Sequence, residues 1–97
     1  MFNDRVFWNP HHVTYKLFTR ALDPVQNPVY LMEFNYRGPF SFSTLYTGTL
    51  IDFGVIHSDE LIYLFDSGIF PLFDFNSIEA GLITEMVNIY TNFVNGR

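Results

Sequence analysis

The 97-residue sequence predicts part of an α/β fold, with one β-strand, a long loop and flanking helices. The strand is predicted over residues 29–36, which are mostly apolar or aromatic on both alternating faces. Such a pattern suits a strand in a parallel sheet that helices cover on both sides. No second convincing strand follows, and one strand cannot satisfy its own backbone donors and acceptors. We therefore expect residues 1–97 to be part of a single larger domain, without an internal domain boundary.

The balance of aromatic and charged residues supports the same interpretation. Aromatic residues make up 20% of the chain and charged residues 15%, against about 25% charged residues in ordinary soluble domains. A domain of this size buries only about 60–65% of its unfolded surface, so many rings would stay exposed in a free-standing chain. We expect a larger fold around this chain or a large interface, including self-association through exposed aromatic side chains.

A first helix is predicted over residues 10–22. Asn9 is a suitable N-cap, and Pro10 at the first helical position loses no hydrogen bond there. The helix is expected to end at Asp23, because the residue before Pro24 disfavours helical geometry. Its apolar face comprises Val13, Leu17 and Ala21.

The segment from Arg37 to His57 is rich in Gly, Ser and Thr and is expected to be irregular. Long connections of this kind are usually functional or disordered. Ser58 is then the expected N-cap of a short helix over residues 59–66, which would stop before Gly68. The side chains that this helix should bury are Leu61, Leu64 and Phe65.

A last helix is predicted from Asn76 to Gly96. Asn76 and Glu79 have the spacing of a capping box. Gly81 weakens the helix by about 1 kcal/mol relative to alanine, so packing rather than propensity must hold it. The apolar stripe is formed by Ile78, Leu82, Met86, Ile89 and Phe93.

Charge and hydropathy exclude several classes of function. The net charge of −5, with only five basic side chains, offers no basic stripe for nucleic acid. The longest uninterrupted apolar run, Leu61 to Phe65, is far shorter than the roughly 18 residues of a membrane span. The N-terminal residues do not have the pattern of a secretory signal. The absence of cysteine excludes disulfides and thiol chemistry.

Three histidines are candidates for chemistry. His11 and His12 point about 100° apart on a helix and lack any metal-ligand spacing, so we interpret them as surface residues and expect no metal or cofactor. His57 closes a glycine-containing loop and precedes a predicted helix. Catalytic groups often lie in such loops, and a histidine there can act as a general base if a nucleophile lies beside it. Position alone would still favour a purely structural loop histidine.

Four blocks of sequence carry a resemblance to a known family. They are Tyr30–Pro39 (YLMEFNYRGP), Ser41–Ser43 (SFS), Gly54–Phe65 (GVIHSDELIYLF) and Tyr90–Phe93 (YTNF). In this order and spacing they resemble the C-terminal part of type-B carboxylesterases, the cholinesterase-like α/β hydrolases, and especially insect-type esterases. The resemblance extends from about Asp4 to the end of the chain.

This resemblance implies that His57 is the catalytic histidine of a serine esterase acting on a small carboxylic ester. In the family, this histidine takes the proton of the nucleophilic serine and returns it to the leaving alcohol. The triad order of serine, acid and histidine places the acid upstream of residue 1. Asp59 and Glu60 are then residues of a helix N-terminus, and Arg37 and Gly38 shape the turn after the strand.

The sequence also departs from the family pattern. Ile56 is bulky where a smaller or polar residue is common, and Tyr90 stands where the family usually has tryptophan. No Gly-x-Ser-x-Gly elbow and no Gly-Gly pair for an oxyanion loop occur. We therefore expect the isolated chain to lack esterase activity.

Two other functions fit the same residues. One is a non-catalytic, cholinesterase-like adhesion protein, although the retained His57 block argues against it. The other is a free-standing small interaction protein, which would have to bury the apolar faces of its strand and helices without the rest of a sheet. An extracellular location is implied only by the family resemblance, and the substrate's identity is not encoded in this segment.

Overall fold

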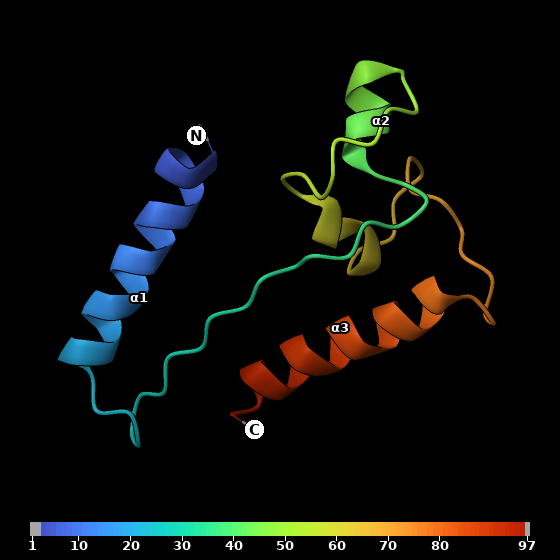
Figure 1. The fold of residues 1–97 in the computed structure, drawn as a ribbon. Coiled ribbons are helices and arrows are strands. Elements are labelled where there is room, and N and C mark those ends of the chain that lie inside the picture. The colour runs from blue at the N-terminus through green and yellow to red at the C-terminus, as the bar shows by residue number, and fades with distance from the viewer. Residues whose placement is uncertain (1–2, 97) are drawn as a thin grey trace. The chain divides into compact units, whose positions relative to one another are not determined.

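The computed structural model describes residues 3–96. The chain forms two compact units, one ending at Glu33 and one beginning at Phe34. Figure 1 shows α1 (Asn9–Ala21) in the first unit, and α2 (Phe42–Thr47) and α3 (Ile78–Val94) in the second. None of the helices in the described part of the chain is long and apolar enough to cross a membrane.

The first unit contains one continuous helical segment, which ends at Ala21. A π-helical turn, η1, spans Asp4–Trp8, and α1 spans Asn9–Ala21. The predicted helix is confirmed, but Asn9 is not its N-cap. The preceding residue, Trp8, is itself helical and makes no side-chain cap. Because Pro10 has no N–H to donate, the chain continues through a wider turn in which the Asn9 N–H donates to the Asp4 carbonyl, five residues back.

The helix ends where the sequence predicts. Leu22 is extended, with φ −109° and ψ 146°, and its N–H donates to the Phe18 carbonyl. The turn that follows is closed by the Asp23 carboxylate, which accepts from the Val25 N–H at 2.9 Å. No residue of η1 or α1 is buried, and the predicted apolar face, including Leu17, is exposed.

Residues 28–38 run without helix or strand, and residues 3–96 contain no β-strand (Figure 1). A strand is defined by hydrogen bonds to a neighbouring strand. The described residues contain no neighbouring strand for residues 29–36, so this segment does not form a strand there. The α/β class and the strand therefore stay predictions.

The core of the second unit is small and largely aromatic. Its buried members are Phe42, Ile62, Tyr63 and Met86. The Tyr63 ring stacks on Phe73 with 5.6 Å between centroids, and lies edge-on to Tyr36 at 5.9 Å. Helix α3 and the 3-10 helix η2 contribute the facing surfaces of this core.

The short helix after His57 differs from the prediction. It is a 3-10 helix, η2, over Asp59–Tyr63, and it buries Ile62 and Tyr63. The predicted Phe65 is 63% exposed. The reason is geometric, because three residues per turn instead of 3.6 bring different side chains to the core.

A second helix lies in the segment that was expected to be irregular. Helix α2 spans Phe42–Thr47. The Ser41 hydroxyl accepts from the Ser43 N–H as an N-cap, and Gly48 ends the helix in the left-handed conformation at φ 66°. Both signals are present in the sequence, but the helix is too short to show a periodic apolar pattern.

Helix α3 spans Ile78–Val94 and confirms the last predicted helix. Its N-cap is Ser77, whose hydroxyl accepts from the Ala80 N–H at 3.2 Å, so the prediction of Asn76 is wrong by one residue. Of the predicted stripe only Met86 is fully buried. The Glu79 carboxylate accepts instead from the Tyr36 hydroxyl at 2.8 Å, which ties the extended segment to α3.

The Tyr63 hydroxyl is buried and has no hydrogen-bond partner among the described residues. Burial, and to a smaller extent the neighbouring Tyr36 and Glu79, together raise the pKa of Tyr63 from 10.0 to about 12. Folding therefore favours the protonated phenol.

This raised pKa predicts a loss of stability in alkali. The contribution of Tyr63 to the free energy of unfolding is complete below pH 10, where the phenol is protonated in both the folded and the unfolded chain. It is lost as the pH rises to about 12, because the phenol of the unfolded chain ionises first. We expect the unfolding free energy from urea titrations to fall over this interval, and to fall less in Tyr63→Phe. The exposed Tyr90→Phe is the control. Equal pH dependence in Tyr63→Phe and the wild type would contradict the prediction.

Candidate active site

His57 lies in a tight turn between Ile56 and the start of η2. The Asp59 N–H donates to the Ile56 carbonyl at 3.2 Å, which closes the turn around His57 and Ser58. Ser58 adopts the left-handed conformation, with φ 72°, and its side chain makes no cap. Ser58 therefore occupies the predicted N-cap position, but its side chain does not cap the helix. The His57 side chain is exposed.

The Asp59 carboxylate is the buried anchor of this turn. It is only 3% exposed, and a carboxylate is rarely buried to this extent unless other groups hydrogen-bond to it. Its Oδ1 accepts from the Phe42 N–H at 2.8 Å, and its Oδ2 accepts from the Ile56 N–H at 3.0 Å. The Ser41 hydroxyl reaches both oxygens, at 3.0 and 2.8 Å. Asp59 does begin η2 as expected, but its carboxylate binds residues outside that helix.

Ser41 connects this anchor to α2. It is fully buried, and its hydroxyl both donates to Asp59 and accepts from the Ser43 N–H at 3.1 Å. The Ser43 hydroxyl lies 3.0 Å from the Ser41 hydroxyl. One hydroxyl group therefore caps α2 and fixes the carboxylate beside the His57 turn.

Arg37 contacts the loop that leads to His57. Its Nε donates to Asp52 Oδ1 at 2.9 Å, and its Nη1 donates to the Gly38 carbonyl. The Gly54 N–H also donates to the same Asp52 oxygen, at 2.7 Å. The Gly54 amide first, and then the Arg37 guanidinium, lower the pKa of Asp52. Because Asp52 is largely exposed, water screens the ion pair and it contributes little to stability.

The other histidines lie on α1 in the first unit. His11 Nδ1 lies 2.7 Å from the Phe7 carbonyl, and both His11 and His12 are exposed. Within residues 3–96 no three His, Asp or Glu side chains are arranged to hold a metal ion.

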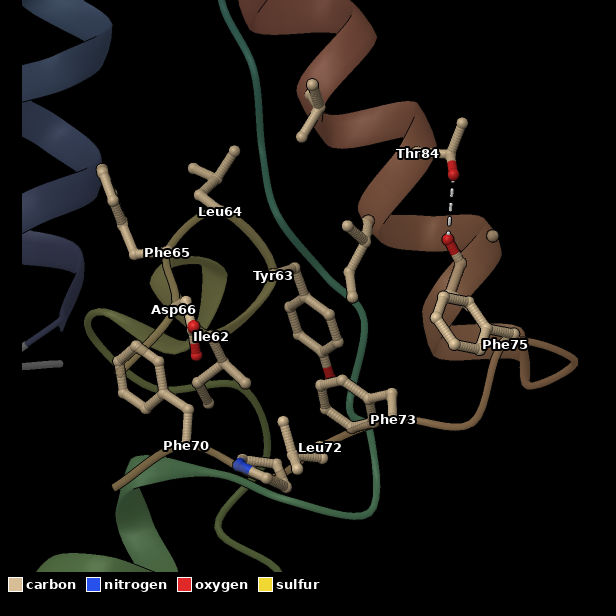
Figure 2. Close-up of a pocket in the computed structure, with 15 residues that line it drawn as sticks. Ile62, Tyr63, Leu64, Phe65, Asp66, Phe70, Leu72, Phe73, Phe75 and Thr84 are labelled. Atoms are coloured by element: carbon tan, nitrogen blue, oxygen red, sulfur yellow. Dashed lines mark hydrogen bonds between the residues drawn. The ribbon is translucent and has the colours of Figure 1, made fainter. Parts of the chain in front are cut away.

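An apolar hollow lies elsewhere in the second unit, between η2, residues 66–75 and α3 (Figure 2). Tyr63, Phe73 and Leu72 line it, and Thr84 on α3 donates to the Ala80 carbonyl at 3.1 Å beside it. His57 is not among its lining residues. The hollow and the His57 turn are thus separate features.

The contacts that fix the site are not apparent in the sequence. Asp59 was expected to be a helix-terminal residue, and Ser41 and Glu79 were not expected to make long-range contacts. The only available signals were the Ser41-x-Ser43 pattern and the position of Asp59 two residues after His57. Neither signal specifies which partner each side chain reaches.

Comparisons with known proteins give one consistent result. The sequence model of the carboxylesterase family matches residues 1–96. The chain is similar to the juvenile hormone esterase of Tribolium castaneum, with 30% identity over 98 residues. The similarity covers 96% of this chain and 16% of that protein. No solved structure matches.

Proposed function

This chain belongs to the carboxylesterase family, and on that premise we propose that it is the C-terminal part of a serine esterase in which His57 is the general base. The observation that carries the proposal is the position of His57. It is exposed at the corner of a turn whose backbone is held by a buried carboxylate. A general base needs such access to substrate and such a fixed backbone.

The proposed reaction is hydrolysis of a carboxylic ester. The His57 imidazole takes the proton from a serine hydroxyl as the serine oxygen attacks the ester carbonyl, and then gives this proton to the departing alcohol. Water then attacks the acyl-enzyme: His57 takes a proton from the water and gives it to the departing serine oxygen, which releases the acid and restores the serine. The relative is a juvenile hormone esterase, so an ester of that kind is the first substrate to test.

The other members of the triad are proposed to lie in sequence that this chain does not include. The chain contains neither a Gly-x-Ser-x-Gly elbow nor a Gly-Gly pair. The matched region spans only 16% of the relative's length. The serine, the acid and the oxyanion donors would therefore come from the preceding part of the family's domain.

The preceding part of the domain would also complete the α/β-hydrolase fold that we propose for this chain. In it, residues 29–36 would pair with neighbouring strands and satisfy their backbone groups. The exposed apolar side chains would be covered by the rest of the domain. Examples are Leu72, which is 94% exposed, and Phe75, which is 98% exposed.

The first test is an assay of the isolated 97-residue chain. We expect no saturable turnover of a nitrophenyl ester, because the chain contains no Gly-x-Ser-x-Gly elbow to supply the nucleophile. Esterase activity should be restored only when the chain is joined to upstream sequence that contains the elbow. Turnover by the isolated chain that His57→Gln abolishes would contradict the proposed division of roles.

A further inference from the structure

We propose that Asp59 is the positioning residue for His57, holding the histidine's backbone in one orientation without contacting substrate. The inference rests on the proposed function, because it gives a role to the same site. It concerns a buried carboxylate that binds the chain on both sides of the histidine.

The first argument is the local hydrogen bonding. The Asp59 carboxylate accepts from the Ile56 N–H at 3.0 Å, and the Asp59 N–H donates to the Ile56 carbonyl at 3.2 Å. His57 and Ser58 are the two residues enclosed by this pair of bonds. The backbone before and after His57 is therefore fixed to the same residue.

The second argument is the connection to the rest of the unit. Asp59 also accepts from the Phe42 N–H at 2.8 Å and from the Ser41 hydroxyl. Ser41 is fully buried, and Phe42 belongs to the core. The turn is thus attached by hydrogen bonds to the packed part of the second unit.

The third argument is the conformation of Ser58. A non-glycine residue at φ 72° is disfavoured and persists only where its surroundings enforce it. The Asp59 contacts provide that constraint. Such a conformation beside a candidate general base indicates that the direction of the His57 side chain is specified by the turn.

An ordinary helix-terminal role does not account for these contacts. A carboxylate at the start of a helix is expected to bind amides of its own first turn. The donors here, the N–H groups of Ile56 and Phe42, both lie outside η2. The arrangement instead joins the turn to the α2 cap over 17 and 18 residues of sequence.

The test compares Asp59→Asn with Asp74→Asn in the 97-residue chain by NMR. Asp74 is a matched control, because its carboxylate also accepts a backbone N–H, that of Asn76, at 2.8 Å. The readouts are the backbone order parameters of residues 56–58, the His57 ring resonances and the Met86 methyl signal. The Met86 signal reports whether the core stays packed.

In Asp59→Asn we expect the order parameters of residues 56–58 to fall from about 0.85 to below about 0.6, and the His57 ring resonances to shift towards those of a free histidine. The Met86 signal should stay unchanged in Asp59→Asn. In Asp74→Asn the order parameters of residues 56–58, the His57 ring resonances and the Met86 signal should all stay unchanged. Unchanged order at His57 in a folded Asp59→Asn protein would overturn the proposal.

A second variant covers the case in which Asp59→Asn loses its fold. Ser41→Ala removes one donor to the carboxylate and leaves the Ile56 and Phe42 amides in place. An intermediate loss of order at residues 56–58 supports the proposal, and no loss overturns it.

Measurements of esterase activity distinguish a failure of this inference from a failure of the proposed function. In an active protein containing this segment, Asp59→Asn should lower kcat by about 100-fold, as expected for a misplaced base, with little change in KM. If Asp59→Asn frees the turn while His57→Gln leaves turnover intact, the positioning holds and the proposed esterase role fails.

Discussion

In a protein that joins this segment to an upstream elbow serine, replacing His57 with glutamine is expected to lower kcat for ester hydrolysis by about 10⁶-fold, the size of loss that follows removal of a triad base. Glutamine is close to histidine in size but cannot take a proton from serine. The serine hydroxyl would then stay protonated during attack, and the leaving alcohol would depart without a proton. The measurement is steady-state hydrolysis of a carboxylic ester by the protein that contains the elbow serine.

His12→Gln is the matched control for this prediction. His12 is an exposed histidine of α1 and makes no contribution to the proposed chemistry. Its replacement should leave kcat and KM unchanged. A His57→Gln protein that keeps wild-type turnover would show that His57 is a structural loop residue.

Replacing Gly38 with alanine is expected to destabilise the second unit by about 2 kcal/mol through overpacking. A Cβ atom on Gly38 would overlap the Tyr63 hydroxyl oxygen and lie 3.0 Å from Tyr36 Cε1. Tyr63 is held by its stacking on Phe73 and is 2% exposed, so its ring cannot move aside without opening the core. Urea unfolding of the variant measures the loss.

The double variant identifies the cause. Tyr63→Phe removes the hydroxyl with which the new methyl group collides, and it also removes an unpaired buried polar group. In the Tyr63→Phe background, Gly38→Ala should cost less, which gives a coupling of about 1 kcal/mol or more between the two sites. Equal costs in both backgrounds would mean that the collision with Tyr63 does not determine the requirement for glycine.

The helices show how far local sequence signals reach. α1 and α3 combine apolar periodicity with caps or breakers, and both were predicted within a few residues. Their starting residues were wrong for local reasons. A π-helical turn over Asp4–Trp8 precedes Pro10 and makes the helix begin earlier, and Ser77 rather than Asn76 caps α3. Element type depends on many residues, whereas an end depends on one or two hydrogen bonds.

The elements around the site were harder to predict, because long-range contacts determine them. η2 is a 3-10 helix, and α2 is only six residues long, so neither has enough turns to show a period. The buried partners of Asp59 lie at Ser41 and Phe42, and no local rule connects them. The strand over residues 29–36 needs a partner that the described residues do not contain.

The candidate site likewise combines features that the sequence predicts with features that depend on long-range contacts. Residue type and loop position made His57 a candidate, and family resemblance, now supported by a match over residues 1–96, gave it a catalytic interpretation. The sequence did not indicate that a buried carboxylate holds its turn, or that Ser58 is left-handed. These features depend on the packing of α2 against the His57 turn.

The most direct test of the central claim is the sequence of the native transcript, read as one molecule through the Met1 codon. We predict that the reading frame continues upstream into a Gly-x-Ser-x-Gly elbow followed by an aspartate or glutamate of the triad, which would make His57 the last member of a complete set. An upstream frame in which another residue replaces the elbow serine, or a transcript whose translation starts at Met1, would contradict the esterase role.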